Sequence, residues 1–466
     1  MTNIASSVRT GARLFTVRLF VLNGLRVISA VVLARFLVPA DYATFGAITI
    51  FISFVQFTVD LGLAGAAIQQ EADPTEAEMA TIFSIQQAMA WLLVIITWIV
   101  APFLTLRLGL SEDAAWMLRA YVLILPITAA RVTPSIRINR ALAFGKIAWI
   151  EVVDGVVMYI VQLSLAVLGA RAWALILSGV TRTATNTLLL SIKAPWRLQV
   201  RFDFAVVRRA LAFAIPYQLN AASAAARGFI PAWALLAMTT PSESGLVMWS
   251  LGITGFVWQF AFLADRVMFP AFSRLVNEPA AATRAATTLL FAGTLGTLAV
   301  AAVVGPMLPA VVPFIFGARW TGAVQILQLL LWAAAGLVTS YLTASILNGM
   351  GMPRARLCTV VLGGTLELAG TLWLVPQIGV MGYAFAVGAA GISEALLALA
   401  FVRRRLAIHL GPLGAAVLAA GASAYGASTV ENPILGGVVA LAIFATVVAL
   451  LARSACTNLV QQVVSR

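Results

Sequence analysis

Charged residues are scarce in this sequence. Only 10% of its 466 residues are Asp, Glu, Lys or Arg, and 62% are hydrophobic. Soluble domains carry about 25% charged and roughly 45–50% apolar residues. The composition therefore excludes a soluble fold and predicts an integral membrane protein.

Cysteine and histidine are also scarce. The chain contains Cys358, Cys456 and a single His409. A zinc or redox site needs several such ligands at close spacing, so no metal, cofactor or disulfide framework is expected. Gly145-Lys146-Ile147 lacks the Ser or Thr and the glycine-rich approach of a phosphate-binding loop, so ATP hydrolysis is not expected either.

The apolar residues fall into about fourteen stretches, each near the roughly 20 residues that a membrane helix needs. They cover residues 14–38, 42–68, 82–106, 114–138, 148–168, 172–192, 210–236, 245–268, 287–316, 322–347, 357–375, 380–402, 413–429 and 434–452. The first stretch is too long for the core of a signal peptide, so no cleaved targeting segment is expected. The predicted fold class is an all-α integral membrane protein of about 14 transmembrane helices.

The basic surplus, 30 Lys and Arg against 17 Asp and Glu, orients the chain. Lys and Arg accumulate in cytoplasmic loops. With the N-terminus inside, most cations, Arg356 among them, fall in inner segments, and the outer loops hold only Arg35, Arg107, Arg171 and Arg319. Both termini are thus predicted to be cytoplasmic, and no nucleic-acid partner is expected. One inner loop, 69–81, is instead acidic, with Glu71, Asp73, Glu76 and Glu78.

Two short motifs recur at similar spacing in the two halves. Pro39-Ala40-Asp41 resembles Pro241-Ser242-Glu243, and the start of the sixth span at Gly169 resembles that of the twelfth at Gly379. An even number of spans in each half predicts parallel repeats. We therefore expect an N-lobe over 1–193, a basic cytoplasmic linker over 194–209 and a C-lobe over 210–405. Residues 406–466 would add two peripheral, lipid-facing spans and a cytoplasmic tail.

Charged groups inside a membrane are costly, so each is a candidate functional residue. The cations in the spans are Arg18, Arg26, Arg119, Arg131, Arg182 and Arg227, and the acids are Asp60, Glu151, Asp154, Glu367 and Glu394. The excess of cations in the first half suits an anionic ligand. Helical depth places Asp60 between Arg18 and Arg26 and sets Arg131 level with Asp154 as a plausible pair. Salt bridges inside a lobe, without a ligand role, remain the alternative.

The opening helices of the two halves carry matching polar faces. One face is formed by Arg18, Asn23, Arg26 and Ser29, and the other by Asn220, Ser223 and Arg227. Such faces predict a central cavity between the lobes, with interhelical hydrogen bonding as the alternative. Pro216 and Pro231 bracket the second face and predict a hinge, because proline interrupts the helical ladder.

Five segments together resemble the polysaccharide-transport flippases of the multidrug/oligosaccharidyl-lipid/polysaccharide exporter superfamily. They are the stretch from Leu33 to Tyr42, Asp60-Leu61-Gly62-Leu63, Phe269 to Leu275, Phe316 to Trp320, and Gly379 to Ala384. The resemblance follows nearly the whole chain in order. It does not identify the sugar.

The resemblance implies a bacterial inner-membrane flippase for undecaprenyl-pyrophosphate-linked oligosaccharides of exopolysaccharide, O-antigen or capsule biosynthesis. It also implies two six-helix lobes around a cationic cavity, two further C-terminal helices, and pyrophosphate-facing charge at Arg18 and Arg26. We add Arg182, Arg227 and Asp60 to the cavity by inference. Membrane lipid and a polysaccharide polymerase are the other expected partners. The alternatives are a multidrug or cation antiporter of the same superfamily, and a membrane polymerase or ligase, which the short outer loops disfavour.

Overall fold

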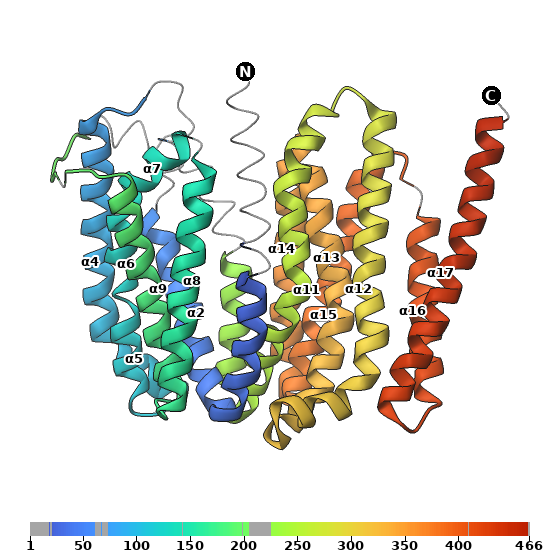
Figure 1. Cartoon of the computed structure of the whole chain (residues 1–466), viewed down its shortest axis with the longest axis horizontal. Helices are drawn as coiled ribbons and strands as arrows, with labels where there is room; N and C mark the ends of the chain where they lie inside the picture. The colour runs from blue at the N-terminus through green and yellow to red at the C-terminus, as the bar shows by residue number, and fades with distance from the viewer. Residues whose placement is uncertain are drawn as a thin grey trace. The chain divides into compact units, whose positions relative to one another are not determined.

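The computed structural model describes residues 18, 21–60, 67, 73–141, 143–197, 199–204, 225–408 and 410–464. Within these ranges the chain forms α-helices and one short 3-10 helix, and no strand occurs in them. The residues pack as two compact units, Met1–Gly245 and Leu246–Arg466 (Figure 1). The all-α fold class predicted from the sequence is confirmed.

Unit 1 is a helical bundle with a single main core. Its helices cover 21–36, α2 Pro39–Asp60, α4 Glu76–Arg107, α5 Ala114–Tyr121, α6 Ile124–Ala130, α7 Val132–Arg140, α8 Phe144–Val167, α9 Ala172–Lys193 and Ala225–Met238. The core joins Ile52, Val94, Leu125 and Ile176 from four of these helices. Phe54 of α2 stacks on Phe229, so helix Ala225–Met238 packs in this unit. The lobe boundary expected at 194–209 stays a prediction.

The fourth predicted span, 114–138, is broken rather than continuous. It consists of α5, α6 and α7, and α7 bends by 46° from the helix before it. Two prolines explain the breaks, because proline has no N–H to continue the helical ladder. Pro126 cannot donate to the Val122 carbonyl, which accepts instead from Leu125 N at 3.0 Å. Pro134 likewise cannot donate to the carbonyl of Ala130, the last residue of α6.

The acidic inner segment is held by arginines of α7. Glu76 pairs with Arg137, and Asp73 lies 2.7 Å from an Arg140 nitrogen. Trp196, at the start of the predicted linker, donates its Nε1–H to Glu76 at 2.8 Å. Helix α4 begins at Glu76, six residues before the predicted span, because Thr75 and Glu78 form a reciprocal cap. The acids that break the charge pattern therefore connect α4, α7 and the segment at Trp196 at one end of this unit.

Unit 2 contains the remaining helices (Figure 1). They are α11 Pro241–Arg274, which begins just before the unit boundary, α12 Pro279–Phe316, the 3-10 helix Ala318–Ala323, α13 Val324–Gly349, α14 Pro353–Ile378, α15 Val380–Arg403, α16 Gly411–Ser428 and α17 Pro433–Val464. Close backbone contact joins α13 to α15. A Cβ on Gly336 would lie 2.8 Å from Ile392 N, so only glycine fits there.

The C-terminal helices pack on α12 through small residues. Ala416, Ala419 and Ala420 are buried together with Leu298 and Phe444. The other face is apolar and exposed, for example at Leu418, where the side chain is 75% exposed. The hairpin thus has an exposed apolar side as well as a face packed into unit 2, and its contact with lipid stays a prediction.

The repeated motifs adopt the same local geometry. Asp41 accepts the Val38 backbone N–H at 2.9 Å, and Glu243 accepts that of Thr240 at 3.0 Å, each at the start of a helix. Gly169 and Gly379 have φ of 79° and 63°, the left-handed region that glycine adopts without strain. The internal repeat is therefore present in the backbone as well as in the sequence.

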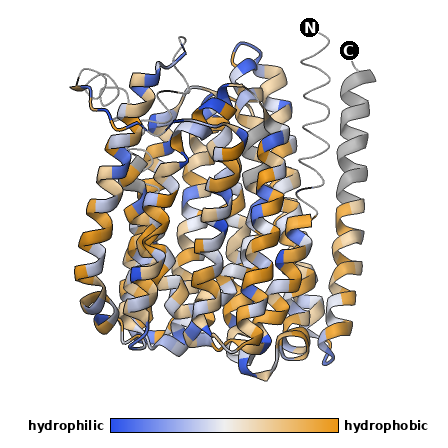
Figure 2. Cartoon of the chain, turned by 60° about the vertical axis from the view of Figure 1, so that its left-hand side comes forward, coloured by the Kyte–Doolittle hydropathy of each residue, from blue (hydrophilic) through white to orange (hydrophobic). Residues whose placement is uncertain are grey.

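The helices are suited to a membrane. Six described helices are long and apolar enough to cross one, and the bent pair Ala114–Ala130 and Val132–Arg140 would make a seventh. The other predicted spans overlap helices that are shorter, more polar or only partly described. Hydrophobic residues dominate along the helices, and hydrophilic residues gather toward their ends (Figure 2). The chain is a multi-pass membrane protein.

Candidate functional site

Unit 1 contains a polar cavity of about 450 Å³. It is lined by α2, α5, α6, α8 and α9 and by the break between α6 and α7. The side chains that line it and can carry charge or hydrogen bonds are Gln56, Tyr121, Thr128, Arg131, Glu151, Asp154, Gln162, Ser178, Arg182, Thr183 and Asn186. Such a concentration of polar groups between apolar spans marks a candidate site.

Asp154 is the centre of the cavity's hydrogen-bond network. Its side chain is only 2% exposed. Arg182 Nε donates to Oδ1 at 3.0 Å, and Asn186 Nδ2 donates to Oδ2 at 2.5 Å. Both carboxylate oxygens are therefore satisfied, as a buried charge requires. Arg182 is half exposed and has further N–H groups beyond the one that Asp154 accepts.

Arg131 enters this network through an amide. Its Nη1 donates to Asn186 Oδ1 at 2.6 Å. Arg131 lies at the break between α6 and α7, so the proline-induced bend brings its backbone to the cavity wall. Asn186 thus links the guanidinium of Arg131 to the carboxylate of Asp154. The pair proposed from helical depth is bridged rather than direct.

A second ion pair joins the first span to α8. Arg18 Nε lies 2.6 Å from Glu151 Oε2. About three turns further along, Ser29 donates to Gln162 Oε1 at 2.8 Å in a buried contact. Glu151 and Gln162 both line the cavity, so these two contacts join the first span to the α8 wall of the cavity. The placement of Asp60 between Arg18 and Arg26 stays a prediction, because the Asp60 side chain lies outside the described residues.

The remaining candidate residues predicted for unit 1 form two groups, those in described helices and those outside the described residues. Arg26 and Asn23 are half-buried in helix 21–36, and Arg26 interacts electrostatically with Tyr159 of α8, as does Arg182. Arg119 belongs to α5 and donates to the Trp98 carbonyl at 3.1 Å. Arg227 and Pro231 lie in helix Ala225–Met238, which continues through the proline. Outside the described part of the chain lie Pro216, Asn220, Ser223 and the side chain of Asp60.

The region has an excess of positive charge. The cavity lining itself is balanced, with Arg131 and Arg182 against Glu151 and Asp154. Two further guanidinium groups come from the first span beside it, Arg18, which pairs with Glu151, and Arg26, which interacts with Tyr159 of α8. In a low-dielectric interior such an excess strongly favours an anion. The arrangement can hold a phosphate-like group through charge-assisted hydrogen bonds.

The two acids predicted in the second half are placed differently. Glu394 of α15 is fully buried and lies 2.6 Å from Arg356 Nη1. Arg356 belongs to the first turn of α14 and not to an inner loop, because α14 begins at Pro353. Glu367, also in α14, is buried. Neither acid lines the apolar cavity of this unit.

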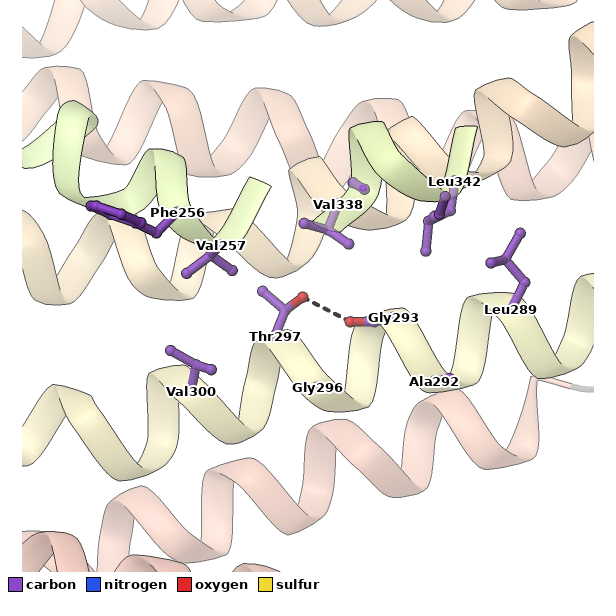
Figure 3. A pocket seen from close by; sticks show the side chains of 12 residues that line it. Phe256, Val257, Leu289, Ala292, Gly293, Gly296, Thr297, Val300, Val338 and Leu342 are labelled. Atoms are coloured by element: carbon purple, nitrogen blue, oxygen red, sulfur yellow. Dashed lines mark hydrogen bonds between the residues drawn. The ribbon is translucent and has the colours of Figure 1, made fainter. Parts of the chain in front are cut away.

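That apolar cavity has a volume of about 530 Å³ and lies among α11, α12 and α13 (Figure 3). Phe256, Val338 and Leu342 point into it. Its one hydroxyl, on Thr297, donates to the Gly293 carbonyl at 2.7 Å and so stays within its own helix. The cavity suits hydrocarbon, in contrast to the cationic cavity of unit 1.

Sequence reasoning missed the amides of the site, Asn186 and Gln162, and the phenol of Tyr121. Asn186 could have been found, because it follows Arg182 by four residues and so lies on the same helix face. In the described residues, no group of three His, Cys, Asp or Glu is placed to hold a metal ion.

A family model described as a polysaccharide biosynthesis protein matches residues 32–325. The chain belongs to this family. The match covers most of unit 1, including α2 to α9, and continues into unit 2 as far as the start of α13. This polysaccharide biosynthesis protein has no match among curated protein sequences.

Solved structures of similar fold are flippases and transporters. The lipid II flippase MurJ in an inward closed conformation matches with a TM-score of 0.77 and 13% identity, over 95% of this chain and 99% of that one. An inward-facing multidrug resistance MATE family transporter of the MOP superfamily matches at 0.60 and 13%, over 84% and 98%. A MOP superfamily transporter from Pyrococcus furiosus matches at 0.56 and 13%, over 86% and 95%. These likenesses show the fold.

Proposed function

We propose that the protein is a flippase that moves an undecaprenyl-pyrophosphate-linked oligosaccharide from the cytoplasmic to the outer leaflet of the bacterial inner membrane. The observation that carries the proposal is the group of four guanidinium side chains in and beside the cavity of unit 1, Arg131 and Arg182 in its lining and Arg18 and Arg26 on the adjoining first span, against the two carboxylates of the lining. A pyrophosphate is the anionic part of such a substrate. Both the family and the fold of the solved flippase and transporters agree with transport rather than catalysis.

In this proposal the cavity arginines hold the pyrophosphate while the lipid tail stays in the bilayer. Arg182 uses Nε for Asp154, and its Nη groups face the ligand. Arg18 and Arg26 contribute from the first span, and Arg227 from the seventh. Asp154 and Glu151 keep the arginines apart and oriented, which favours planar, bidentate contact with phosphate oxygens.

Transport follows by alternating access of the two lobes without ATP hydrolysis. The acids predicted within the spans, Asp60, Glu151, Asp154, Glu367 and Glu394, are the groups that can couple an ion to this change, with Arg131 as a charge partner. Both termini face the cytoplasm. The oligosaccharide carrier lipid, bilayer lipid and a polysaccharide polymerase are the proposed partners.

The test is export in cells together with anion binding in vitro. Arg26→Ala and Arg182→Ala should each abolish polymer export, and Arg26→Ala should do so at an unchanged protein level. The matched control is Arg107→Ala, since Arg107 ends α4 on the outer side and stacks on Phe103 of its own helix. Inorganic pyrophosphate should bind the purified wild-type protein and the control but not the two cavity variants.

A drug or cation antiporter of the same superfamily is the competing function. It requires a buried acid available to an organic cation, whereas Glu151, Asp154 and Glu394 are each paired with an arginine. Full polymer export by a stably inserted Arg26→Ala protein would contradict the flippase proposal. Binding of tetraphenylphosphonium in place of pyrophosphate would favour the antiporter.

A further inference from the structure

Unit 2 contains a second cavity, in which a group of polar side chains is set among apolar ones. The cavity has a volume of about 640 Å³. Its lining comes from α12, α13, α15, α16, the turn after α16 and α17: Gly305, Pro306, Gln325, Gln328, Leu329, Trp332, Met381, Ala424, Ala427, Ser428, Val430, Glu431 and Pro433. In the predicted topology, these segments all meet at the outer side of the membrane. At 1.5 Å per residue, the cavity reaches from this end to Gly305, roughly 16 Å along α12.

The chemistry of this lining points to one ligand class. It offers two amides, a hydroxyl, one carboxylate and an indole, and none of the lining residues is Lys or Arg. A phosphate would meet the Glu431 carboxylate without a cation, and a hydrocarbon chain would strand the amides without partners. Amides and a carboxylate pair well with neighbouring hydroxyl groups, and an aromatic ring covers an apolar face.

Gln328 is held in position by a backbone carbonyl of α12 that lacks its helical hydrogen bond. Pro309 has no N–H, so the Gly305 carbonyl four residues earlier lacks its helical donor. Gln328 Nε2 donates to that carbonyl at 2.9 Å. Because a carbonyl can only accept, this bond fixes which side of the amide carries Oε1. The amide therefore presents a fixed acceptor at the cavity and not a freely rotating one.

The C-terminal hairpin completes the cavity. Ser428 and Glu431 come from its outer turn, and both are exposed. The hairpin is set against α12 at close range, since a Cβ on Gly437 would lie 2.3 Å from Met307 Cγ and 3.0 Å from the Val303 carbonyl oxygen. This packing places the turn over α13, where Gln325 and Trp332 lie. The two helices that follow the internal repeat thus have a role besides facing lipid.

We propose that this cavity is a subsite for a neutral carbohydrate, formed by Gln325, Gln328, Trp332, Ser428 and Glu431. This subsite is separate from the cavity of unit 1 that is proposed to bind pyrophosphate. The inference rests on the proposed function in one respect, that the transported substrate carries sugar. In it, Trp332 lies against the ring face while the amides and Glu431 bond the hydroxyl groups.

The experiment is saturation-transfer NMR on the full chain in lipid nanodiscs, because common detergents themselves carry sugar groups. The probes are methyl glucoside, methyl galactoside and N-acetylglucosamine, with tetramethylammonium as a cationic probe. Gln325→Ala and Glu431→Gln should each weaken sugar affinity about fivefold, the effect of one lost hydrogen bond. Both residues are exposed, so unfolding temperature should not change.

The matched control is Glu112→Gln, an exposed outer-loop acid of unit 1, which should bind the sugars like the wild type. Equal sugar affinity in the wild type and both cavity variants, or no sugar signal in the wild type, would overturn the proposal. So would Glu431-dependent binding of tetramethylammonium without sugar binding. Pyrophosphate binding measured on the same samples reports on the proposed function separately, because it depends on Arg182.

Discussion

Asn186 accepts a hydrogen bond from Arg131 at 2.6 Å and passes one on to the buried carboxylate of Asp154 at 2.5 Å. A neutral amide of α9 therefore connects the cation at the break between α6 and α7 to the acid of α8. The bridge leaves Arg131 less neutralised than a direct ion pair would. That difference matters for a cavity proposed to bind an anion.

Two substitutions of Asn186 should separate its contribution to stability from its contribution to pyrophosphate binding. Asn186→Leu removes a bond to each charged neighbour and should lower the free energy of unfolding by about 1–3 kcal/mol. Asn186→Asp should instead pair directly with Arg131 and weaken pyrophosphate binding. Thermal unfolding and isothermal calorimetry measure the two effects. Asn139→Leu is the control, since Asn139 bonds only within α7; equal pyrophosphate affinity in Asn186→Asp would contradict the role of the bridge.

Breaking the ion pair between Arg182 and Asp154 should show how much a buried acid without its arginine destabilises the protein. Arg182→Leu leaves Asp154 with Asn186 alone and should destabilise the protein by about 1–3 kcal/mol, a value reduced because Arg182 is half exposed. Adding Asp154→Leu should restore the unfolding temperature but not pyrophosphate binding. Recovery of binding in the double variant would show that Arg182 is not a ligand.

The pair of Arg356 with Glu394 is more deeply buried and should matter more for stability. Glu394→Ala should cost about 3–5 kcal/mol, because it leaves a guanidinium that is only 13% exposed without its partner. Joint replacement by Arg356→Met and Glu394→Leu should recover most of that loss. If the double variant also exports polymer, Glu394 is structural; loss of export in a stable double variant would assign it to ion coupling.

Two glycines of unit 2 should respond in opposite ways to the same substitution. Gly336→Ala should destabilise the contact of α13 with α15, because the added carbon meets backbone atoms of Gly391 and Ile392 at 2.8–2.9 Å. Gly296→Ala should be neutral or stabilising, since no atom lies within 4 Å of its Cβ position in the apolar cavity. Thermal unfolding of the two variants side by side tests the close packing.

The helix cap at the start of α11 predicts a pH dependence. Hydrogen bonds from the Thr240 side chain and backbone lower the pKa of Glu243. A lowered pKa in the folded state means that the cap stabilises fully above the unfolded value near 4.3 and is lost as the pH falls through the folded value. The stability difference between the wild type and Glu243→Gln should therefore be constant at neutral pH and shrink below about pH 4. A difference independent of pH would exclude ionised Glu243 as the cap.

The sequence by itself determined that the chain crosses a membrane as helices, and it located them. Apolar runs of the right length leave no other structure for the backbone in lipid. It also predicted that the first half carries the buried cations and that two motifs repeat. Both features depend on which residues stand at particular positions and not on how distant segments pack. The caps at Asp41 and Glu243 and the turns at Gly169 and Gly379 follow from those few residues alone.

Only the tertiary structure decided which charges meet. Depth along a helix does not give rotation or tilt, so neither the contact of Arg18 with Glu151 nor the bridge that Asn186 forms between Arg131 and Asp154 follows from it. The bend at Arg131 and the cavity closed by Glu431 depend on contacts between helices distant in sequence. A hydropathy pattern records how apolar a segment is, whereas partner choice depends on the packing of side chains from several segments in three dimensions.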